Sequence, residues 1–258
     1  MKIAAFDFDG TILFEDGIAD DTLTAIREWR DAGNLAVAAT GKSLSATQYS
    51  LRGYDLSFDY AAVFTGAVLT DGDWEVLHRS TLDPVTVRRI VEDLSPVENI
   101  SVYGTMLGGR DVRFSTTIPS EKATSILTDF LDMDVADIDT LTDASFVGVP
   151  VRVPDNAPLR DRIHRDIMAS YEVGCMVNQN FVDILPAGAS KGAGLERLLG
   201  HLGVARDEVE LISFGDSWND LSMHAIADQA FSFPWSPDDV KNATGEVIGS
   251  VAEVLPRL

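Results

Sequence analysis

Short apolar runs that alternate with amphipathic segments organise the first eighty residues of this sequence. The runs at residues 3–6, 35–39 and 60–64 have the length of buried strands, and segments with helical spacing separate them. Such strand–helix–strand alternation is typical of a parallel sheet with helices on its faces. The same rhythm returns after Pro186, so both ends of the chain are expected to build one α/β sheet.

The rhythm is different between about Ser80 and Pro186. Helix-like segments at residues 84–94, 119–131 and 158–170 alternate there with strand-like segments at residues 99–103, 111–115, 145–153, 172–177 and 181–185. This pattern predicts an α+β domain inserted into the chain that forms the sheet. We therefore expect a core domain of residues 1–79 and 187–258, and an inserted domain of residues 80–186.

The charge balance is strongly acidic. The 258 residues include 20 basic and 41 acidic side chains, which give a formal net charge of −21. This charge argues against partners such as nucleic acid or anionic membranes, although a local cation still lets a small anionic substrate bind.

No apolar run approaches the ~18 residues of a membrane-spanning helix. The single cysteine excludes an intrachain disulfide and suits a reducing compartment. We expect a cytoplasmic protein, as a monomer or a weak homo-oligomer.

Two carboxylates, Asp7 and Asp9, follow the first apolar run, and Gly10 and Thr11 come directly after them. Alternate residues of a strand point to the same side, so both carboxylates would lie at the strand's carboxyl end. Open α/β sheets bind ligands at that end. Two adjacent carboxylates repel each other unless a cation or a shared proton relieves them. A solvated acidic turn is the alternative, and the pair alone does not exclude it.

Further polar residues fall at predicted strand ends or in adjacent loops, namely Thr40, Lys191, Asp216 and Asp220. A carboxylate can attack phosphorus, and other carboxylates can hold Mg²⁺. A hydroxyl and an ammonium group would offset the charge on phosphoryl oxygens. Each residue has an ordinary alternative role, such as a helix N-cap for Thr40 or a solvated lysine for Lys191. Together, and in this order, they favour phosphoryl transfer.

Four stretches resemble the motifs of the haloacid dehalogenase-like (HAD) superfamily, in its Cof-type branch with a type IIB cap. They are Phe-Asp-Phe-Asp-Gly-Thr at residues 6–11, Ala-Thr-Gly at 39–41, Ala-Ser-Lys-Gly at 189–192 and Gly-Asp-Ser-Trp-Asn-Asp at 215–220. The likeness extends to residues 182–186 and 240–244, so it spans both outer segments. It implies a Rossmann-like parallel-sheet core with helices on both faces, and an inserted α+β cap of type C2B.

The resemblance also implies catalytic roles. Asp7 would be the nucleophile that forms a phosphoaspartate, and Asp9 would act first as general acid and then as general base. Thr40 and Lys191 would hold the phosphoryl group. Gly10 and Gly41 would let backbone N–H groups approach it.

A Mg²⁺ cofactor is implied in the same way. It would be bound by the Asp7 carboxylate, the Asp9 backbone carbonyl and Asp216, with support from Asp220. Asn219 would orient the phosphate or the groups around the metal. Asn180, near the return to the core, is a candidate for contact with the substrate, as is Asn178.

The sequence departs from the family pattern at three places. Lys42 stands where relatives often carry arginine, Thr65 stands where they often carry asparagine, and Ser217-Trp218 replaces the usual central pair of the fourth motif. Lysine lacks the two-pronged geometry of a guanidinium group. These differences leave the nucleophile, acid and metal set in place, and they leave the substrate open.

The sequence therefore predicts a Mg²⁺-dependent phosphatase that acts on a small phosphorylated metabolite. A sugar phosphate is favoured, because residues 182–192 are also similar to sucrose-phosphate phosphatases of the same branch. A phosphosugar mutase on this scaffold is the alternative enzyme. A ligand-binding protein without catalysis is the third hypothesis, and the intact Asp7, Asp9, Lys191 and Asp216 argue against it.

Overall fold

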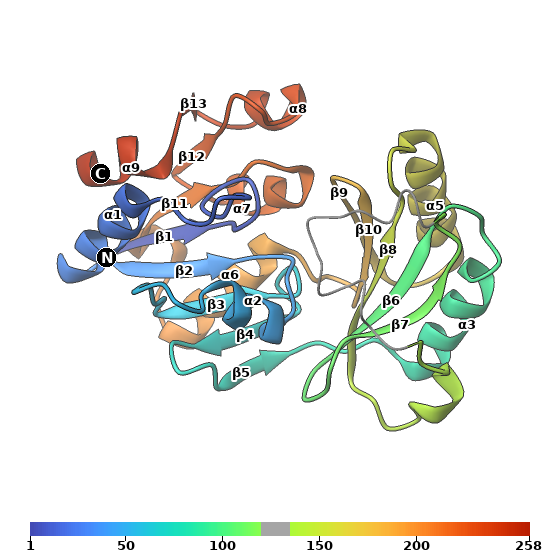
Figure 1. The fold of residues 1–258 in the computed structure, drawn as a ribbon. Coiled ribbons are helices and arrows are strands. Elements are labelled where there is room, and N and C mark those ends of the chain that lie inside the picture. The colour runs from blue at the N-terminus through green and yellow to red at the C-terminus, as the bar shows by residue number, and fades with distance from the viewer. Residues whose placement is uncertain (120–134) are drawn as a thin grey trace. The chain divides into compact units, whose positions relative to one another are not determined.

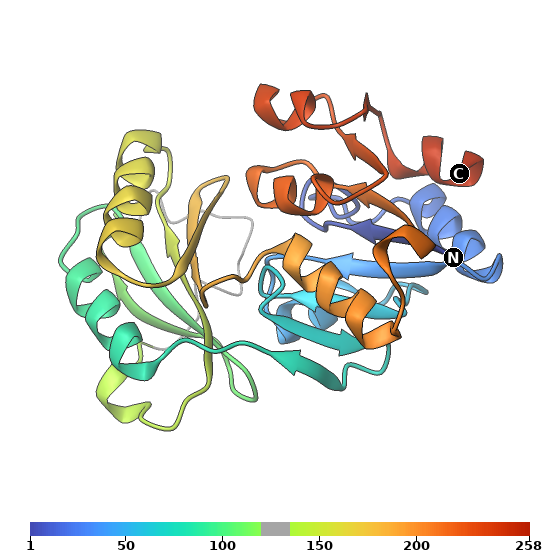
Figure 2. The same ribbon diagram turned by 180° about the vertical axis from the view of Figure 1, so that it is seen from behind.

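The computed structural model describes residues 1–119 and 135–258, which form two compact units (Figures 1 and 2). The core unit consists of residues 1–79 and 189–258, and the inserted unit consists of residues 80–188. The helix predicted at residues 119–131 lies, apart from Pro119, outside the described residues. Among the described residues, no helix combines the length and apolar character that crossing a membrane requires.

One mixed sheet forms the centre of the core unit. Its strand order is β13-β12-β11-β1-β2-β3-β4-β5, in which the first six strands are parallel and β4 and β5 run antiparallel to their neighbours. Strand β1, from the start of the chain, pairs with β2 on one side and with β11 on the other. The strands are β1 (Lys2–Phe6), β2 (Leu35–Ala39), β3 (Tyr60–Val63), β4 (Val68–Asp71), β5 (Val76–Arg79), β11 (Glu210–Phe214), β12 (Gln229–Ser232) and β13 (Glu246–Val247).

Helices cover both faces of this sheet, with α1 and α6 on opposite sides (Figures 1 and 2). Asp20 or Asp21 would be a favourable N-cap residue for α1 from the sequence alone, but Ala19 is the N-cap residue, and both carboxylates lie in the first turn, where the helix dipole favours them. The helices are α1 (Asp20–Asp31), α2 (Leu44–Ser50), α6 (Lys191–Leu202), α7 (Leu221–His224), α8 (Asp238–Asn242) and α9 (Val251–Val254), with 3-10 turns at Arg206–Glu208, Trp218–Asp220 and Leu255–Arg257.

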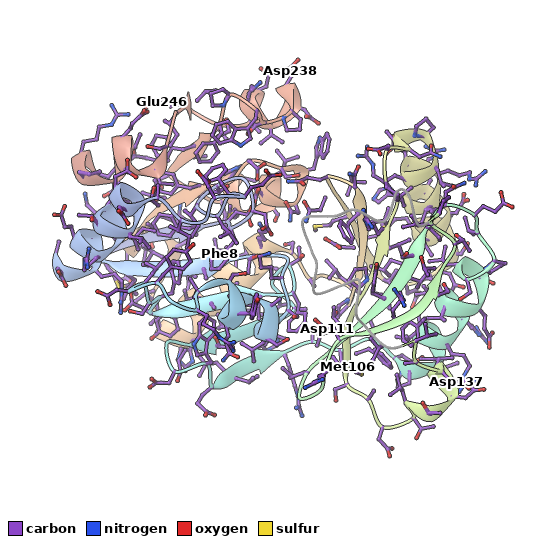
Figure 3. All side chains as sticks on the ribbon, in the orientation of Figure 1. Phe8, Met106, Asp111, Asp137, Asp238 and Glu246 are labelled. Carbon is purple, nitrogen blue, oxygen red and sulfur yellow. The ribbon has the colours of Figure 1, made fainter. Side chains whose placement is uncertain are left out.

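Small residues let α6 pack closely against the sheet. A Cβ atom on Gly194 would lie 2.9 Å from the Cβ of Ala62, so a larger residue at position 194 would push the helix away. Leu195 and Leu198 of α6 pack against alternate residues of β1 and β2, including Ile3. Phe8, just beyond β1, is also fully buried (Figure 3). This packing fixes the start of α6, and therefore Lys191, in the core unit.

The inserted unit is an antiparallel sheet with the strand order β7-β6-β8-β10-β9. Helices α3 and α5 pack on one face of it, where Ile90 and Ile163 join Val151 and Ile184 in a buried apolar cluster. The predicted α+β character of this segment is confirmed. Its elements are α3 (Pro84–Leu94), β6 (Ser101–Met106), β7 (Val112–Thr116), a 3-10 turn (Ile138–Thr140), β8 (Phe146–Arg152), α5 (Ala157–Ser170), β9 (Gly174–Asn178) and β10 (Phe181–Leu185).

Candidate active site

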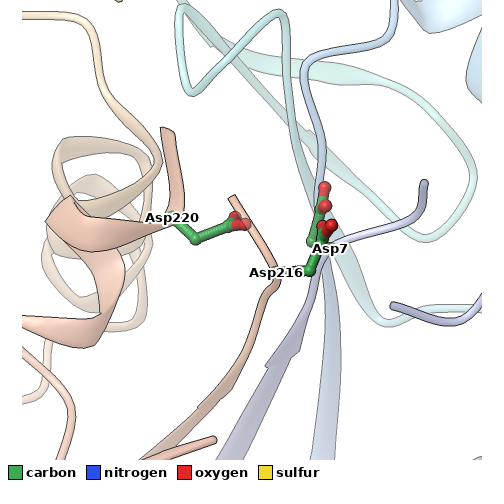
Figure 4. A group of neighbouring side chains, drawn as sticks. All are labelled: Asp7, Asp216 and Asp220. Atoms are coloured by element: carbon green, nitrogen blue, oxygen red, sulfur yellow. The ribbon is translucent and has the colours of Figure 1, made fainter. Parts of the chain in front are cut away.

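Three carboxylates meet at the carboxyl edge of the core sheet, as Figure 4 shows. One carboxylate oxygen from each of Asp7, Asp216 and Asp220 lies within 4.8 Å of the other two, and the three side chains are buried. Parallel pairing of β1 with β11 aligns Phe6 with Phe214, so the residues that follow these strands leave the sheet side by side. The sheet topology thus brings together acidic residues more than 200 positions apart in the sequence.

Lys191 joins this cluster from the first position of α6. Its Nζ donates hydrogen bonds to Asp7 Oδ1 at 2.5 Å and to Asp220 Oδ1 at 2.6 Å, and its side chain is fully buried. Asp220 Oδ2 accepts a hydrogen bond from the backbone N–H of Ser217 at 2.9 Å. Both oxygens of Asp220 therefore have protein partners, and this residue holds Lys191 in place.

The buried charges in this cluster perturb one another. Burial raises the pKa of Asp7 well above its ordinary value, with Asp220 adding to the rise and Lys191 opposing it. Burial, reinforced by Asp220, raises the pKa of Asp216 to about 7. Burial alone would lower the pKa of Lys191, but Asp220 and Asp7 outweigh it and raise that pKa. Three carboxylates thus face a single buried ammonium group, and a further positive charge would stabilise all three.

The donor set fits a hard divalent cation. Asp216 Oδ1 is buried and has no hydrogen-bond partner among the described residues, which leaves an oxygen available to a metal. Gly10 adopts a φ of 82°, and a Cβ atom there would lie 2.5 Å from Asp216 Oδ2, so a side chain would fill the space beside that carboxylate. Carboxylate oxygens are the ligands that Mg²⁺ prefers. Asp7 and Asp216 would hold the ion, and the negative charge of the nearby Asp220 would favour its binding.

Thr40 is buried at the end of β2, the strand next to β1. Its Oγ1 accepts a hydrogen bond from the backbone N–H of Lys42 at 3.2 Å, and its own N–H donates to Ala62. Thr40 does not cap a helix, because Ser43 is the N-cap residue of α2. Gly41, in the same turn, is half-buried.

Asp9 differs from Asp7 in its surroundings. Its side chain is 54% exposed, and its Oδ2 lies 2.9 Å from Nζ of Lys42 in an ion pair. The turn that carries Asp9 is tied to the C-terminal segment, because Trp235 Nε1 donates a hydrogen bond to the Gly10 carbonyl at 2.8 Å. Sequence reasoning noticed Lys42 only as a departure from a motif, and no signal in the sequence pointed to Trp235.

The two asparagines proposed from the sequence lie in different units. Asn219 is buried in the 3-10 turn that also carries Asp220, and its Oδ1 has no hydrogen-bond partner among the described residues. Asn180 lies in the inserted unit at the turn between β9 and β10, where it is exposed and its carbonyl accepts a hydrogen bond from Val153. The core unit therefore contains Asn219 next to the acidic cluster, whereas Asn180 belongs to the other unit.

Comparison with known proteins gives consistent matches over almost the whole chain. Residues 4–254 match the family model described as haloacid dehalogenase-like hydrolase. An HMP-PP phosphatase of Enterobacter sp. (strain 638) is 26% identical over 231 residues, which cover 86% of this chain and 80% of that protein.

Solved structures with the same fold include a haloacid dehalogenase-like hydrolase from B. subtilis, with a TM-score of 0.84 and 18% identity over the full length of both chains. A HAD subclass IIB sugar phosphatase has a TM-score of 0.82 and 19% identity, covering 100% of this chain and 98% of that one. The predicted α/β fold class is confirmed by these matches.

Proposed function

Since this chain belongs to the haloacid dehalogenase-like hydrolases and is a phosphatase of that family, we propose that it uses Mg²⁺ and a phosphoaspartate at Asp7 to hydrolyse a small phosphorylated metabolite. The observation that carries the proposal is the buried contact of Lys191 with Asp7 and Asp220, beside an Asp216 oxygen that has no hydrogen-bond partner in the described part of the chain. The proposed nucleophile, the cation that would orient it and the proposed metal ligands thus lie together at one end of the sheet.

The proposed reaction has two steps. A carboxylate oxygen of Asp7 attacks phosphorus, the bond from phosphorus to the ester oxygen breaks, and Asp9 gives its proton to that oxygen to form the alcohol. A water molecule then attacks phosphorus, its proton passes to the Asp9 carboxylate, and the bond between phosphorus and Asp7 breaks. Inorganic phosphate is released, and both carboxyl groups return to their starting forms.

The other buried residues support these steps. Lys191 fixes Asp7 for attack and offsets negative charge on the phosphoryl oxygens. Thr40, at the end of the neighbouring strand, would donate a hydrogen bond to the same group, and Gly10 and Gly41 would give close access to backbone N–H groups. Asn219 would orient the phosphate. Bound Mg²⁺ would neutralise charge on the transferring group.

Residues 80–186 are proposed to act as the cap domain that selects the leaving group, with Asn180 among its substrate-binding residues. The segment enters the chain between the second and third motifs, and covering a site of this kind excludes water from the reaction. A sugar phosphate is the first candidate substrate, since one structural relative is a sugar phosphatase.

A substrate screen tests this proposal. Phosphate release is measured from sugar phosphates, other small phosphorylated metabolites and HMP-PP, with Mg²⁺ and with a chelator. We expect Mg²⁺-dependent release that is strongest for one class of small phosphate ester. Movement of phosphate within a hexose phosphate without net release would favour a mutase. Metabolite binding without turnover in the presence of Mg²⁺ would favour a ligand-binding protein. Release unchanged by the chelator would contradict the assigned cofactor.

Asp216→Asn is expected to stabilise the metal-free protein and to remove its response to Mg²⁺. Burial raises the pKa of Asp216 from its ordinary value of 3.8 to about 7 in the folded protein. The folded state therefore holds this proton more tightly than the unfolded state does. The contribution of Asp216 to the free energy of unfolding therefore falls as the pH rises from 3.8, the ordinary pKa, to about 7, the pKa in the fold. The full loss is present above pH 7. Asparagine avoids that loss, which is on the order of 2–4 kcal/mol above neutral pH and fades towards pH 4.

Thermal unfolding of the wild type and the variant, at several pH values with chelator or Mg²⁺, measures this effect. Mg²⁺ should raise the unfolding temperature of the wild type only, because a ligand stabilises the state that binds it. Asp228→Asn is the matched control. The Leu211 N–H lowers the pKa of Asp228, so its replacement should not stabilise the protein at any pH. An equal Mg²⁺ response in wild type and Asp216→Asn would exclude Asp216 as a ligand.

A further inference from the structure

We propose that Lys42 is a positioning residue for proton transfer, because it holds the Asp9 carboxylate where the leaving group needs it. This inference rests on the proposed function, in which Asp9 gives a proton to the ester oxygen. The contact itself is direct, with 2.9 Å between Lys42 Nζ and Asp9 Oδ2.

The two partners in this ion pair differ in how firmly they are held. The Lys42 side chain is only 10% exposed, whereas the Asp9 side chain is 54% exposed. In the described part of the chain, Lys42 is the only residue with which the Asp9 side chain forms a hydrogen bond or an ion pair. An exposed carboxylate without this contact would sample several rotamers. Lys42 is therefore the group that selects one of them.

The backbone of Lys42 is fixed at both of its polar groups. Its N–H donates to Thr40 Oγ1 at 3.2 Å, and its carbonyl accepts a hydrogen bond from Phe64 N–H at 2.9 Å. Thr65 N–H also donates to the Thr40 carbonyl, so the ends of β2 and β3 are tied together around this turn. The ammonium group of Lys42 thus projects from a rigid support to a carboxylate on the neighbouring strand end.

The alternative role for Lys42 is direct contact with the phosphoryl group. The basicity of the leaving group distinguishes the two roles. Proton donation matters most when the leaving alkoxide is a strong base, and it matters little for a weakly basic phenolate. A residue that acts through Asp9 therefore affects alkyl phosphates much more than p-nitrophenyl phosphate. A residue that binds the phosphoryl group affects both to the same extent.

The experiment is a double-mutant cycle of Lys42→Met and Asp9→Asn, measured with p-nitrophenyl phosphate and with the best alkyl phosphate substrate. Lys42→Met should lower kcat for the alkyl ester by about tenfold to a hundredfold, with KM nearly unchanged. The loss on p-nitrophenyl phosphate should stay below about threefold. In the Asp9→Asn background, Lys42→Met should have no further effect on the alkyl ester, because residues that act as a unit are not additive.

Two further variants check the assignment. Lys42→Arg should restore most of kcat, because a guanidinium group also pairs with a carboxylate. Arg27→Met is the matched control, since it breaks an exposed ion pair with Asp55 in the same unit and should leave kcat unchanged. If Lys42→Met does not fold, Lys42→Gln takes its place in the cycle.

Equal losses on both substrates, a raised KM or additive effects in the cycle would overturn the inference. If phosphatase activity depends on Asp7 but the effects of Lys42→Met and Asp9→Asn are additive, this inference alone is overturned. Phosphate release that persists without the Asp7 carboxylate would overturn the proposed function, and this inference with it.

Discussion

Asp7→Asn should abolish phosphate release, with a loss in kcat of about 10⁴-fold or more. Asparagine keeps the shape of the side chain but cannot attack phosphorus to form an acyl phosphate. The fold should survive the change. Burial and the neighbouring Asp220 raise the pKa of Asp7. Keeping this carboxylate ionised in the fold therefore lowers the free energy of unfolding, and asparagine avoids that loss. The unfolding temperature of the metal-free variant should therefore match or exceed that of the wild type above neutral pH.

The covalent intermediate gives this prediction a second readout. Acid quench of the wild type during turnover, followed by peptide mass analysis, should find one phosphoryl group on the peptide that contains Asp7. Asp9→Asn is the informative control. With an aryl phosphate it should still accept the phosphoryl group but release it slowly, because the base for water attack is missing. Activity that survives Asp7→Asn, under conditions that exclude deamidation and contaminating enzymes, would contradict the mechanism.

Lys191→Met should destabilise the protein more than any other single change at the site. Lys191 is fully buried and is hydrogen-bonded to two carboxylates, and removal of the cation leaves Asp7 and Asp220 as buried charges without compensation. Breaking a buried ion pair in this way lowers the free energy of unfolding by roughly 3–5 kcal/mol. Phosphate release should fall by about a hundredfold or more, since an electrostatic contact to the transferring group is lost as well.

Denaturant unfolding of the wild type, Lys191→Met and a double variant separates the effect on stability from the effect on activity. Asp220→Asn combined with Lys191→Met should recover part of the stability, because one of the two uncompensated carboxylates is then neutral. Activity should not recover with it, because the ammonium group is still missing. If Lys191→Met unfolds at the same denaturant concentration as the wild type, the ion pairs to Asp7 and Asp220 do not contribute to stability.

Much of the fold follows from local pattern. The apolar runs at residues 3–6 and 35–39 are buried strands, and the return of alternation after Pro186 places β11 beside β1. The N-cap residue of α1 could not be predicted, because an aspartate is favoured both at the N-cap and in the first turn of a helix, and the sequence alone does not separate the two.

The candidate site was predictable where it depends on strand ends. Asp7 and Asp216 meet because parallel neighbouring strands end at the same edge of the sheet. The contacts of Lys42 with Asp9 and of Trp235 with Gly10 were missed. These contacts depend on the paths of loops beyond the strands, and a side chain's partner across two loops has no periodic signature in the sequence.

The pairing of β1 with β11 also determines how much of the chain must be synthesised before the candidate site can assemble. Lys191, the ion-pair partner of Asp7, is 184 positions further along the chain. Contacts of such long sequence separation form late, since the intervening chain must first be ordered. A nascent chain that ends before α6 contains the proposed nucleophile, Asp7, but neither Lys191 nor Asp216. We therefore expect catalytic competence to arise only after the inserted unit and the residues through Asp220 have been synthesised.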